Sequence, residues 1–221
     1  MIKILNKRLE TLSAFILDNE CVIDIGCDHG LLGIYLFLNR KNLKMISSDV
    51  NRGPLEKAQE NLEKYNLVDK IELRLGNGLQ VMSNDINTIV ISGMGGITIT
   101  NILQNINKYK NVSKLVLSPN NEFPYVRKTL SKLGFYIVNE KMVLEKGKYY
   151  LVSEYKRGKG KVNYYFGKLD LQDKIVKSYY ENLYNKNKKI LEKLSLYQKL
   201  KCLNLIKENI LIKRKYRLNG K

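Results

Sequence analysis

The alternation of short apolar runs with amphipathic segments over residues 1–155 most constrains what this chain can fold into. Apolar runs bounded by polar or glycine residues are typical of buried strands. The predicted strands are residues 21–25, 44–48, 70–75, 88–92, 114–117, 135–144 and 148–155. The segments between them predict helices at residues 6–17, 31–39, 54–65, 97–106 and 124–133. Strands that alternate with helices favour an α/β fold with a parallel, doubly wound sheet.

The last two predicted strands break this pattern. Only Glu145, Lys146 and Gly147 separate their apolar cores. Three residues are too few for a crossover between parallel strands, but they are enough for a hairpin turn. We therefore expect the final strand to lie antiparallel, at or near an edge of the sheet.

A glycine-punctuated basic run at residues 156–161 marks a linker. It predicts a first domain at residues 1–158 and a second at 159–221. In the second domain, apolar residues recur at helical spacing, which predicts two antiparallel helices forming a hairpin or short coiled coil. The two series are Ile175, Tyr179, Leu183, Ile190, Leu194 and Tyr197, then Leu200, Leu203, Ile206 and Ile210. The spacing allows the turn at either Asn187 or Ser195.

The net charge of +18 is unevenly distributed. Residues 1–155 contain 20 Lys and Arg against 16 Asp and Glu, whereas residues 156–221 contain 19 against 5. Such a surface favours a polyanion, because neutralising phosphates releases counterions. A solvated tail produced by nucleotide bias is the alternative, but bias alone would spread the excess evenly. Five tyrosines can either stack on unpaired bases or belong to the core: Tyr164, Tyr165, Tyr179, Tyr180 and Tyr184.

Other sequence features exclude several classes of protein. No apolar run is long enough for a membrane span, and no apolar signal core begins the chain, so we expect a cytoplasmic protein. Cys21, Cys27 and Cys202 are an odd number without paired short spacing. They predict reduced thiols and neither a disulfide framework nor a zinc cluster.

The strand ends carry the residues suited to chemistry. Residues 24–30 (DIGCDHG) follow the first strand, and their glycines allow a tight turn and close approach to a ligand. Their spacing, G-x-x-x-G-x-x-G when Gly33 is included, differs from the dinucleotide fingerprint. Asp49 ends the second strand, where a carboxylate can accept hydrogen bonds from both ribose hydroxyls. These residues leave both nicotinamide and adenosyl cofactors open.

Three further strand ends narrow the choice. Residues 76–78 (GNG) form a small polar loop that can receive an adenine ring. Residues 92–96 (SGMGG) let the backbone come close to a flat ligand. Residues 118–121 (SPNN) offer amide side chains to a base edge. Ordinary turns are the alternative explanation, although all these loops fall on one side of the predicted sheet.

At these motifs the chain resembles the class I S-adenosylmethionine (SAM)-dependent methyltransferases. More narrowly, it resembles the TrmK family of bacterial tRNA (adenine-N1)-methyltransferases acting on position 22. The motifs are residues 7–9 (KRL), 24–30, 53–54 (GP), 77–78, 92–96 and 118–120 (SPN). The resemblance implies a Rossmann-like seven-stranded sheet, a basic helical coiled-coil extension, SAM as cofactor, S-adenosylhomocysteine as product and tRNA as partner. We also expect a monomer that needs no metal.

The resemblance and the chemistry of the residues together give three expected sets. The catalytic set is Asp28, Met94 and Asn120. The cofactor-binding set is Asp24, Gly26, Asp28, His29, Gly30, Asp49, Val50, Gly76, Asn77, Gly78, Ser92, Gly93, Met94 and Gly95. The RNA-binding set is Arg8, Lys156, Arg157, Lys159 and Lys161. Two assignments stay open: His29 is either a general base or a loop anchor, and Arg8 either binds phosphate, closes over the active-site loop or forms a surface salt bridge.

Three other functions remain open from the sequence. The chain can be a methyltransferase of another RNA base or of protein, or a non-catalytic RNA-binding protein with a vestigial nucleotide fold. A nicotinamide oxidoreductase is the least favoured, because of the glycine spacing and the basic tail.

Overall fold

A computed structural model describes residues 6–218 of the chain. The chain forms two compact units, which divide between Lys168 and Leu169. This division lies beyond the linker that the sequence indicated at residues 156–161, since the final strand continues to Arg157 and the segment after it folds back onto the first unit.

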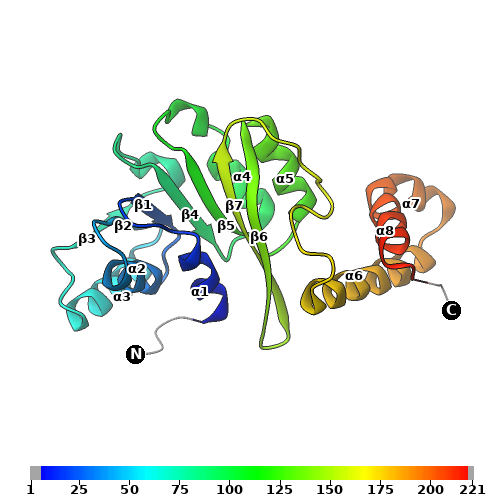
Figure 1. Ribbon diagram of the computed structural model, residues 1–221, viewed down its shortest axis with the longest axis horizontal. Helices are drawn as coiled ribbons and strands as arrows, with labels where there is room; N and C mark the ends of the chain where they lie inside the picture. The colour runs from blue at the N-terminus through cyan, green and yellow to red at the C-terminus, as the bar shows by residue number, and fades with distance from the viewer. Residues whose placement is uncertain (1–5, 219–221) are drawn as a thin grey trace. The chain divides into compact units, whose positions relative to one another are not determined.

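The first unit contains a seven-stranded sheet in the order β3-β2-β1-β4-β5-β7-β6 (Figure 1). The strands are β1 (Cys21–Ile25), β2 (Lys44–Asp49), β3 (Ile71–Leu75), β4 (Thr88–Ser92), β5 (Lys114–Ser118), β6 (Phe135–Glu145) and β7 (Lys148–Arg157). The first five strands are mutually parallel, and β7 inserts antiparallel between β5 and β6. The predicted doubly wound sheet with an antiparallel hairpin end is confirmed.

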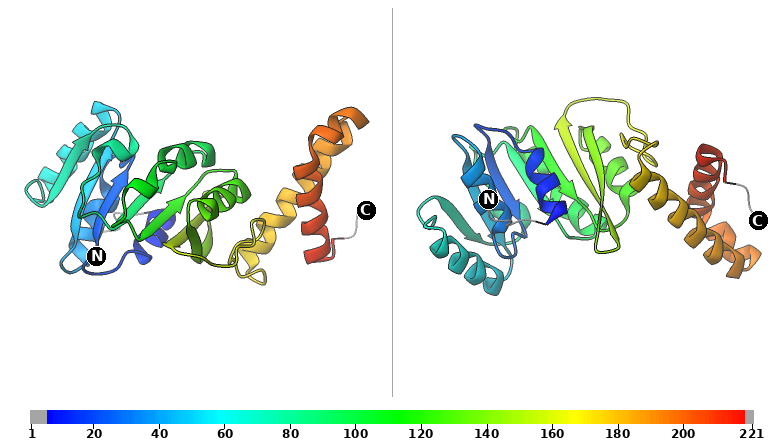
Figure 2. Two further views of the ribbon diagram at one scale, coloured as in Figure 1. Left: turned by 90° about the horizontal axis from the view of Figure 1, so that it is seen from above. Right: turned by 60° about the horizontal axis from the view of Figure 1, so that its bottom comes forward.

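Five helices flank this sheet on its two faces (Figure 1, Figure 2). They are α1 (Lys7–Ala14), α2 (Leu31–Asn39), α3 (Arg52–Lys64), α4 (Gly96–Leu103) and α5 (Phe123–Lys132). Apolar residues of α1, α2 and α3 pack on one face, and those of α4 and α5 pack on the other. The helix predicted at 97–106 ends earlier, and a short 3-10 turn follows it at Ile106–Lys108. A second 3-10 turn, η1, spans Gly78–Val81.

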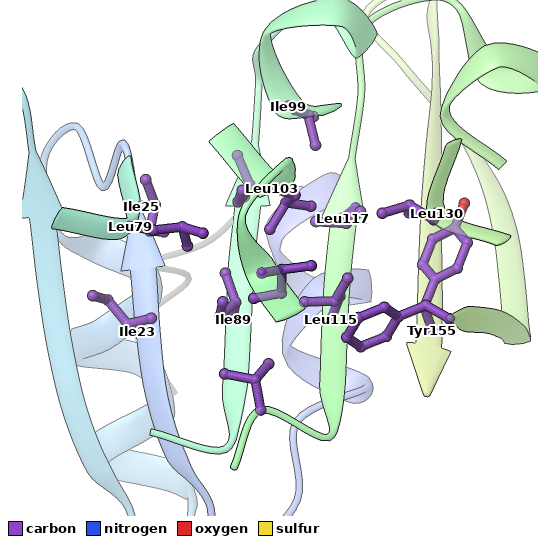
Figure 3. Close-up of a cluster of buried hydrophobic side chains, with 14 of the residues drawn as sticks. Ile23, Ile25, Leu79, Ile89, Ile99, Leu103, Leu115, Leu117, Leu130 and Tyr155 are labelled. Carbon is purple, nitrogen blue, oxygen red and sulfur yellow. The ribbon is translucent and has the colours of Figure 1, made fainter. Parts of the chain in front are cut away.

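Burial on both faces of the sheet explains why the sequences of the strands are continuously apolar. Within β1, Ile23 and Ile25 enter the cluster that also holds Leu103 and Leu117 (Figure 3), whereas Val22 enters the cluster on the opposite face. Both faces of the central strands are therefore buried, as the helices on both sides require. The sheet is a rigid support whose carboxyl edge carries the loops described below.

A buried ion pair holds the end of the first unit against the sheet. Arg127 on α5 and Glu140 on β6 lie 2.9 Å apart between Nε and Oε1, with side chains 1% and 0% exposed. Arg127 Nη1 also donates to the carbonyl oxygens of Tyr164 and Tyr165, at 3.0 and 2.9 Å. The Lys168 N–H donates to Glu140 Oε2 at 2.7 Å. These bonds explain why the compact unit extends to Lys168.

The second unit consists of α6 (Lys174–Lys193), α7 (Leu196–Lys201) and α8 (Leu203–Tyr216). Helices α6 and α8 pack side by side and antiparallel (Figure 2): Asn187 Nδ2 donates to Glu208 Oε2 at 3.2 Å, and the rings of Tyr180 and Tyr216 stack at 5.9 Å. The expected helical hairpin is confirmed, with a short third helix at its turn. The turn is at Ser195, because Asn187 lies buried inside α6.

Burial in this unit decides between the two roles considered for the tyrosines and corrects part of the predicted apolar stripe. Tyr180 and Tyr184 are buried, so they belong to the core and do not offer stacking surfaces. Five residues predicted to lie on a buried stripe are exposed: Ile190, Tyr197, Leu200, Leu203 and Ile210. Among the described residues, no helix has both the length and the apolar content that a membrane crossing requires.

Candidate active site

Three glycine-containing loops, which follow β1, β3 and β4, meet at the carboxyl edge of the parallel strands. The N–H groups of Gly26 and Cys27 donate to Ser48 O on β2, at 2.8 and 3.0 Å. Similarly, Gly76 N donates to Asp49 O at 2.9 Å, and Gly93 N donates to Ser118 O at 3.0 Å. Each loop is thus tied to the neighbouring strand, and a nucleotide is the class of ligand that such an edge receives.

The carboxyl group of Asp24 is strongly perturbed at this edge. Burial and, after it, the nearby charge of Asp49 raise the pKa of Asp24 to about 7, and Arg8 opposes the increase. Within residues 6–218, no hydrogen-bond donor contributes to this pKa. A buried carboxyl group without a donor is suited to pair with a cationic group of a ligand.

Asp49 ends β2 beside this position. Its Oδ1 accepts the N–H of Asn51 at 2.9 Å, which fixes the carboxylate at the turn into α3. Within residues 6–218, the other carboxylate oxygen accepts no hydrogen bond, so it is available to hydroxyl groups. Val50, also expected at the cofactor, is 59% exposed.

The loop after β4 is held by two asparagines from the loop after β5. Asn120 donates from Nδ2 to Gly93 O at 2.6 Å and from its backbone N–H to Met94 O at 2.8 Å. Asn121 Oδ1 accepts the N–H of Gly96 at 2.9 Å. The sequence predicted that the Asn120 amide faces a base. Its Nδ2 instead donates to the loop, so only its amide oxygen is left for a ligand. Asn121, which the sequence analysis also offered to a base edge, instead holds the start of α4.

Gly26 shows why the first loop requires glycine. Its φ is +77°, and a Cβ built there would lie 2.2 Å from Met94 Cε. The Met94 side chain therefore lies directly against the backbone of Gly26. The structure thus brings together the first and fourth strand-end loops that the sequence singled out separately.

Asp28 and His29 project from the first loop toward solvent. Asp28 has φ +52°, and the two side chains are 74% and 52% exposed, with His29 Nε2 3.6 Å from Asp28 Oδ1. The backbone of His29 is held by Asn61, whose Nδ2 donates to His29 O at 2.9 Å. Helix α3 therefore anchors the loop through a main-chain contact, and both side chains stay accessible.

Arg8 reaches this edge from α1. Its guanidinium carbon lies 5.1 Å from the centre of the Tyr150 ring, and its Nη1 lies 3.2 Å from where a Cβ of Gly93 would be. Among residues 6–218, the buried Nε of Arg8 has no hydrogen-bond partner. Of the three roles considered from the sequence, this position favours contact with the loop after β4. No sequence motif indicated Tyr150 as the partner of Arg8, because the pairing of β6 with β7 determines where Tyr150 lies.

The basic residues expected to bind RNA fall at different places. Lys156, Lys159 and Lys161 are exposed. Arg157 instead stacks on Phe135, with its guanidinium carbon 4.6 Å from the ring centre, and donates to the carbonyl oxygens of Val112 and Tyr109, at 2.7 and 3.0 Å. Arg157 thus holds the segment before β5, and we leave it out of the RNA-binding set below.

A polar cavity of about 370 Å³ lies at the opposite end of the sheet from the glycine loops. Its lining includes Glu20, Lys114 and Lys156. The buried Lys114 ammonium is already paired with Glu20, at 2.5 Å. Because the buried ammonium there is already neutralised, the carboxyl edge remains the candidate active site. No group of three or more His, Cys, Asp or Glu side chains within the described residues is placed to hold a metal ion, and all three cysteines are free.

Comparison with known proteins identifies the family of this chain. The family described as "Methyltransferase domain" matches residues 5–152. The tRNA (adenine(22)-N(1))-methyltransferase of Bacillus subtilis is 35% identical over 150 residues, which cover 67% of this chain and 63% of that protein. A putative tRNA methyltransferase of Mycoplasma pneumoniae is 28% identical over 72% of this chain and 75% of its own length.

Solved structures extend the similarity over both units. A putative tRNA (m1A22) methyltransferase of Streptococcus pneumoniae has a TM-score of 0.85 and 30% identity, covering 95% of this chain and 98% of its own. TrmK of M. capricolum, solved with S-adenosyl-homocysteine, has a TM-score of 0.83 and 28% identity, covering 96% and 97%. The chain therefore belongs to the methyltransferase domain family and, within it, to the TrmK-type proteins.

Proposed function

We propose that this chain is a SAM-dependent methyltransferase that methylates N1 of adenine 22 in tRNA. The observation that carries the proposal is the buried, donor-free carboxyl group of Asp24 beside Asp49, at the edge where the glycine loops converge. The names of the relatives support the substrate and the position. The chain's own geometry supports a cationic nucleoside ligand.

The residues at the carboxyl edge fit this cofactor. SAM supplies an electrophilic methyl group on a positively charged sulfur and also carries an ammonium group. Asp24 would hold a cationic group, and Asp49 would hold the ribose hydroxyls. The loops would bind the rest of the SAM molecule, because their glycines permit close approach of the backbone. The loop residues expected to contact SAM are Gly26, His29, Gly30, Val50, Gly76, Asn77, Gly78, Ser92, Gly93 and Gly95.

The protein residues contribute mainly alignment and charge stabilisation. Adenine N1 is paired in a duplex, so the target base must leave its helix before attack. Asn120 would orient the base edge, and Met94 would pack near its face. Asp28, exposed at the loop, would stabilise the positive charge that develops on the methylated ring. The attacking lone pair carries no proton, so His29 has no required role as a base.

The second unit would bind the RNA. Residues 169–221 contain 14 Lys and Arg against 5 Asp and Glu. These basic side chains are suited to phosphates, and so, on the first unit, are the exposed Lys156, Lys159 and Lys161. We place the functional boundary at Lys168, where the compact units divide. We further propose that the enzyme acts as a monomer in the cytoplasm.

Direct product mapping tests the function. Incubation with an unmodified tRNA transcript and labelled SAM should give 1-methyladenosine at position 22, identified by mass spectrometry of the digested RNA. A transcript with guanine at position 22 is the matched control and should stay unlabelled. Equal labelling of both transcripts, or methylation at another base, would overturn the assignment of adenine 22.

Asp49→Ala should weaken SAM binding by about 10- to 100-fold, because hydrogen bonds to a charged acceptor contribute about 1.5–3 kcal/mol. Isothermal titration calorimetry measures the affinity. Asp69→Ala is the control, since Asp69 is exposed near the opposite end of the neighbouring strand β3. An Asp49→Ala protein that binds SAM like the control would remove Asp49 from the ribose site.

A further inference from the structure

Helix α7 and the first residue of α8 present apolar side chains that stay exposed among residues 6–218. Leu196, Tyr197, Leu200 and Leu203 are 79%, 67%, 61% and 61% exposed. Leu196 and Leu200 follow the spacing i, i+4 on α7, with Tyr197 next to Leu196, and Leu203 begins α8 after the break at Cys202. We call these four residues the α7 face. The sequence pattern predicted burial for most of them, so the exposure needs an explanation.

The α7 face is part of an ordered helix. Ser195 Oγ accepts the N–H of Gln198 at 3.3 Å, while Gln198 Oε1 accepts the N–H of Ser195 at 2.9 Å. This reciprocal capping box stabilises the start of α7, which also packs against α8. A contiguous apolar patch on an ordered element is typical of a binding surface.

The charges around the α7 face indicate which partner covers it. Residues 193–207 contain Lys193, Lys199, Lys201 and Lys207 and no Asp or Glu. The Lys201 ammonium lies 4.5 Å from the centre of the Tyr197 ring. A second copy of this chain would bring lysines against lysines, which is unfavourable. A nucleic acid offers phosphates to the lysines and base faces to the apolar side chains.

We propose that the α7 face binds an unstacked base of the tRNA, with the surrounding lysines on adjacent phosphates. This inference rests on the proposed function, and it adds a contact made by α7, on the second unit. Tyr197 would stack on the base, and Leu196 and Leu200 would enclose its edge. Because aromatic stacking tolerates every base, the contact contributes affinity for folded tRNA without selecting the methylated position.

Substitutions in the full-length protein test this contact. Tyr197→Ala and Leu200→Ser should each raise the Kd for tRNA roughly tenfold, measured by fluorescence anisotropy at fixed salt. They should raise the tRNA KM similarly and leave kcat at saturating tRNA unchanged. Tyr197→Phe keeps the ring and should retain wild-type affinity. Leu38→Ser, at a 51% exposed leucine on α2, is the matched control and should have no effect.

Salt dependence separates stacking from charge. Tyr197→Ala should keep the wild-type slope of log Kd against log salt, whereas Lys199→Gln combined with Lys201→Gln should make that slope shallower. Thermal unfolding of each variant shows whether the fold is retained. Anisotropy reports binding alone, so failure of the methylation proposal would leave this test intact.

Three results would overturn the inference. The first is unchanged tRNA affinity in folded Tyr197→Ala and Leu200→Ser. The second is that wild type binds vesicles containing phosphatidylserine, and that Leu200→Ser abolishes this binding but keeps tRNA affinity. This result would identify a membrane-binding surface. The third is that wild type sediments as a dimer, and that Leu200→Ser dissociates this dimer without changing tRNA affinity. This result would identify a self-association surface.

Discussion

Replacing Arg127 with methionine is expected to lower the free energy of unfolding of the first unit by about 3–5 kcal/mol. The side chain of Glu140 is 0% exposed and would lose the guanidinium that neutralises it. Ser153 Oγ and the Lys168 N–H still donate to this carboxylate, at 2.9 and 2.7 Å, but neither carries its counter-charge. Urea unfolding followed by circular dichroism measures the loss.

Two comparisons make this prediction specific. Lys57→Met removes an exposed ion pair with Glu60 and should leave the unfolding midpoint unchanged. Arg127→Met combined with Glu140→Leu removes both charges and should recover much of the lost stability, since the penalty arises from the unpaired charge. A single variant as stable as wild type, or a double variant no better than the single, would contradict the mechanism.

The sheet was predictable from sequence because its strands are buried on both faces. Continuous apolar runs such as residues 88–92 are what a strand between two helix layers requires. The three residues between the last two apolar cores, Glu145, Lys146 and Gly147, permit only a hairpin. Because parallel strands share one carboxyl edge, predicting the strands also placed Asp24 and Asp49 at the same edge. That part of the site followed from topology.

Contacts that depend on packing were not predictable. Nothing in the local sequence pairs Arg127 with Glu140 or seats Arg157 on Phe135, because those partners meet only after the hairpin inserts beside β5. Arg157 thus had the appearance of an RNA ligand within a basic run. Likewise, helical periodicity shows which residues share a face but does not identify what covers it, so Leu200 was predicted to be buried.

Asp24→Asn is expected to make the folded protein more stable above pH 7, although it removes a residue proposed to bind the cofactor. The folded-state pKa of Asp24 is raised to about 7 by burial and by Asp49. Because this pKa is higher in the folded state than in the unfolded state, protonated Asp24 stabilises the fold at low pH. Wild type loses this stability as the pH rises through about 7. With about 1.4 kcal/mol per pKa unit, the loss is on the order of 4 kcal/mol, and the asparagine variant avoids it.

Unfolding measured from pH 4 to pH 9 should therefore show the stability difference between variant and wild type opening between about pH 4 and pH 7 and then levelling off. Asp69→Asn, at an exposed position, should show no such change.

A cationic cofactor needs Asp24 ionised, so SAM binding to wild type below pH 7 should release a proton. Calorimetry in two buffers of different ionisation enthalpy detects this release. A pH-independent difference in stability, together with no proton release, would show that Asp24 is not the group that titrates at this edge.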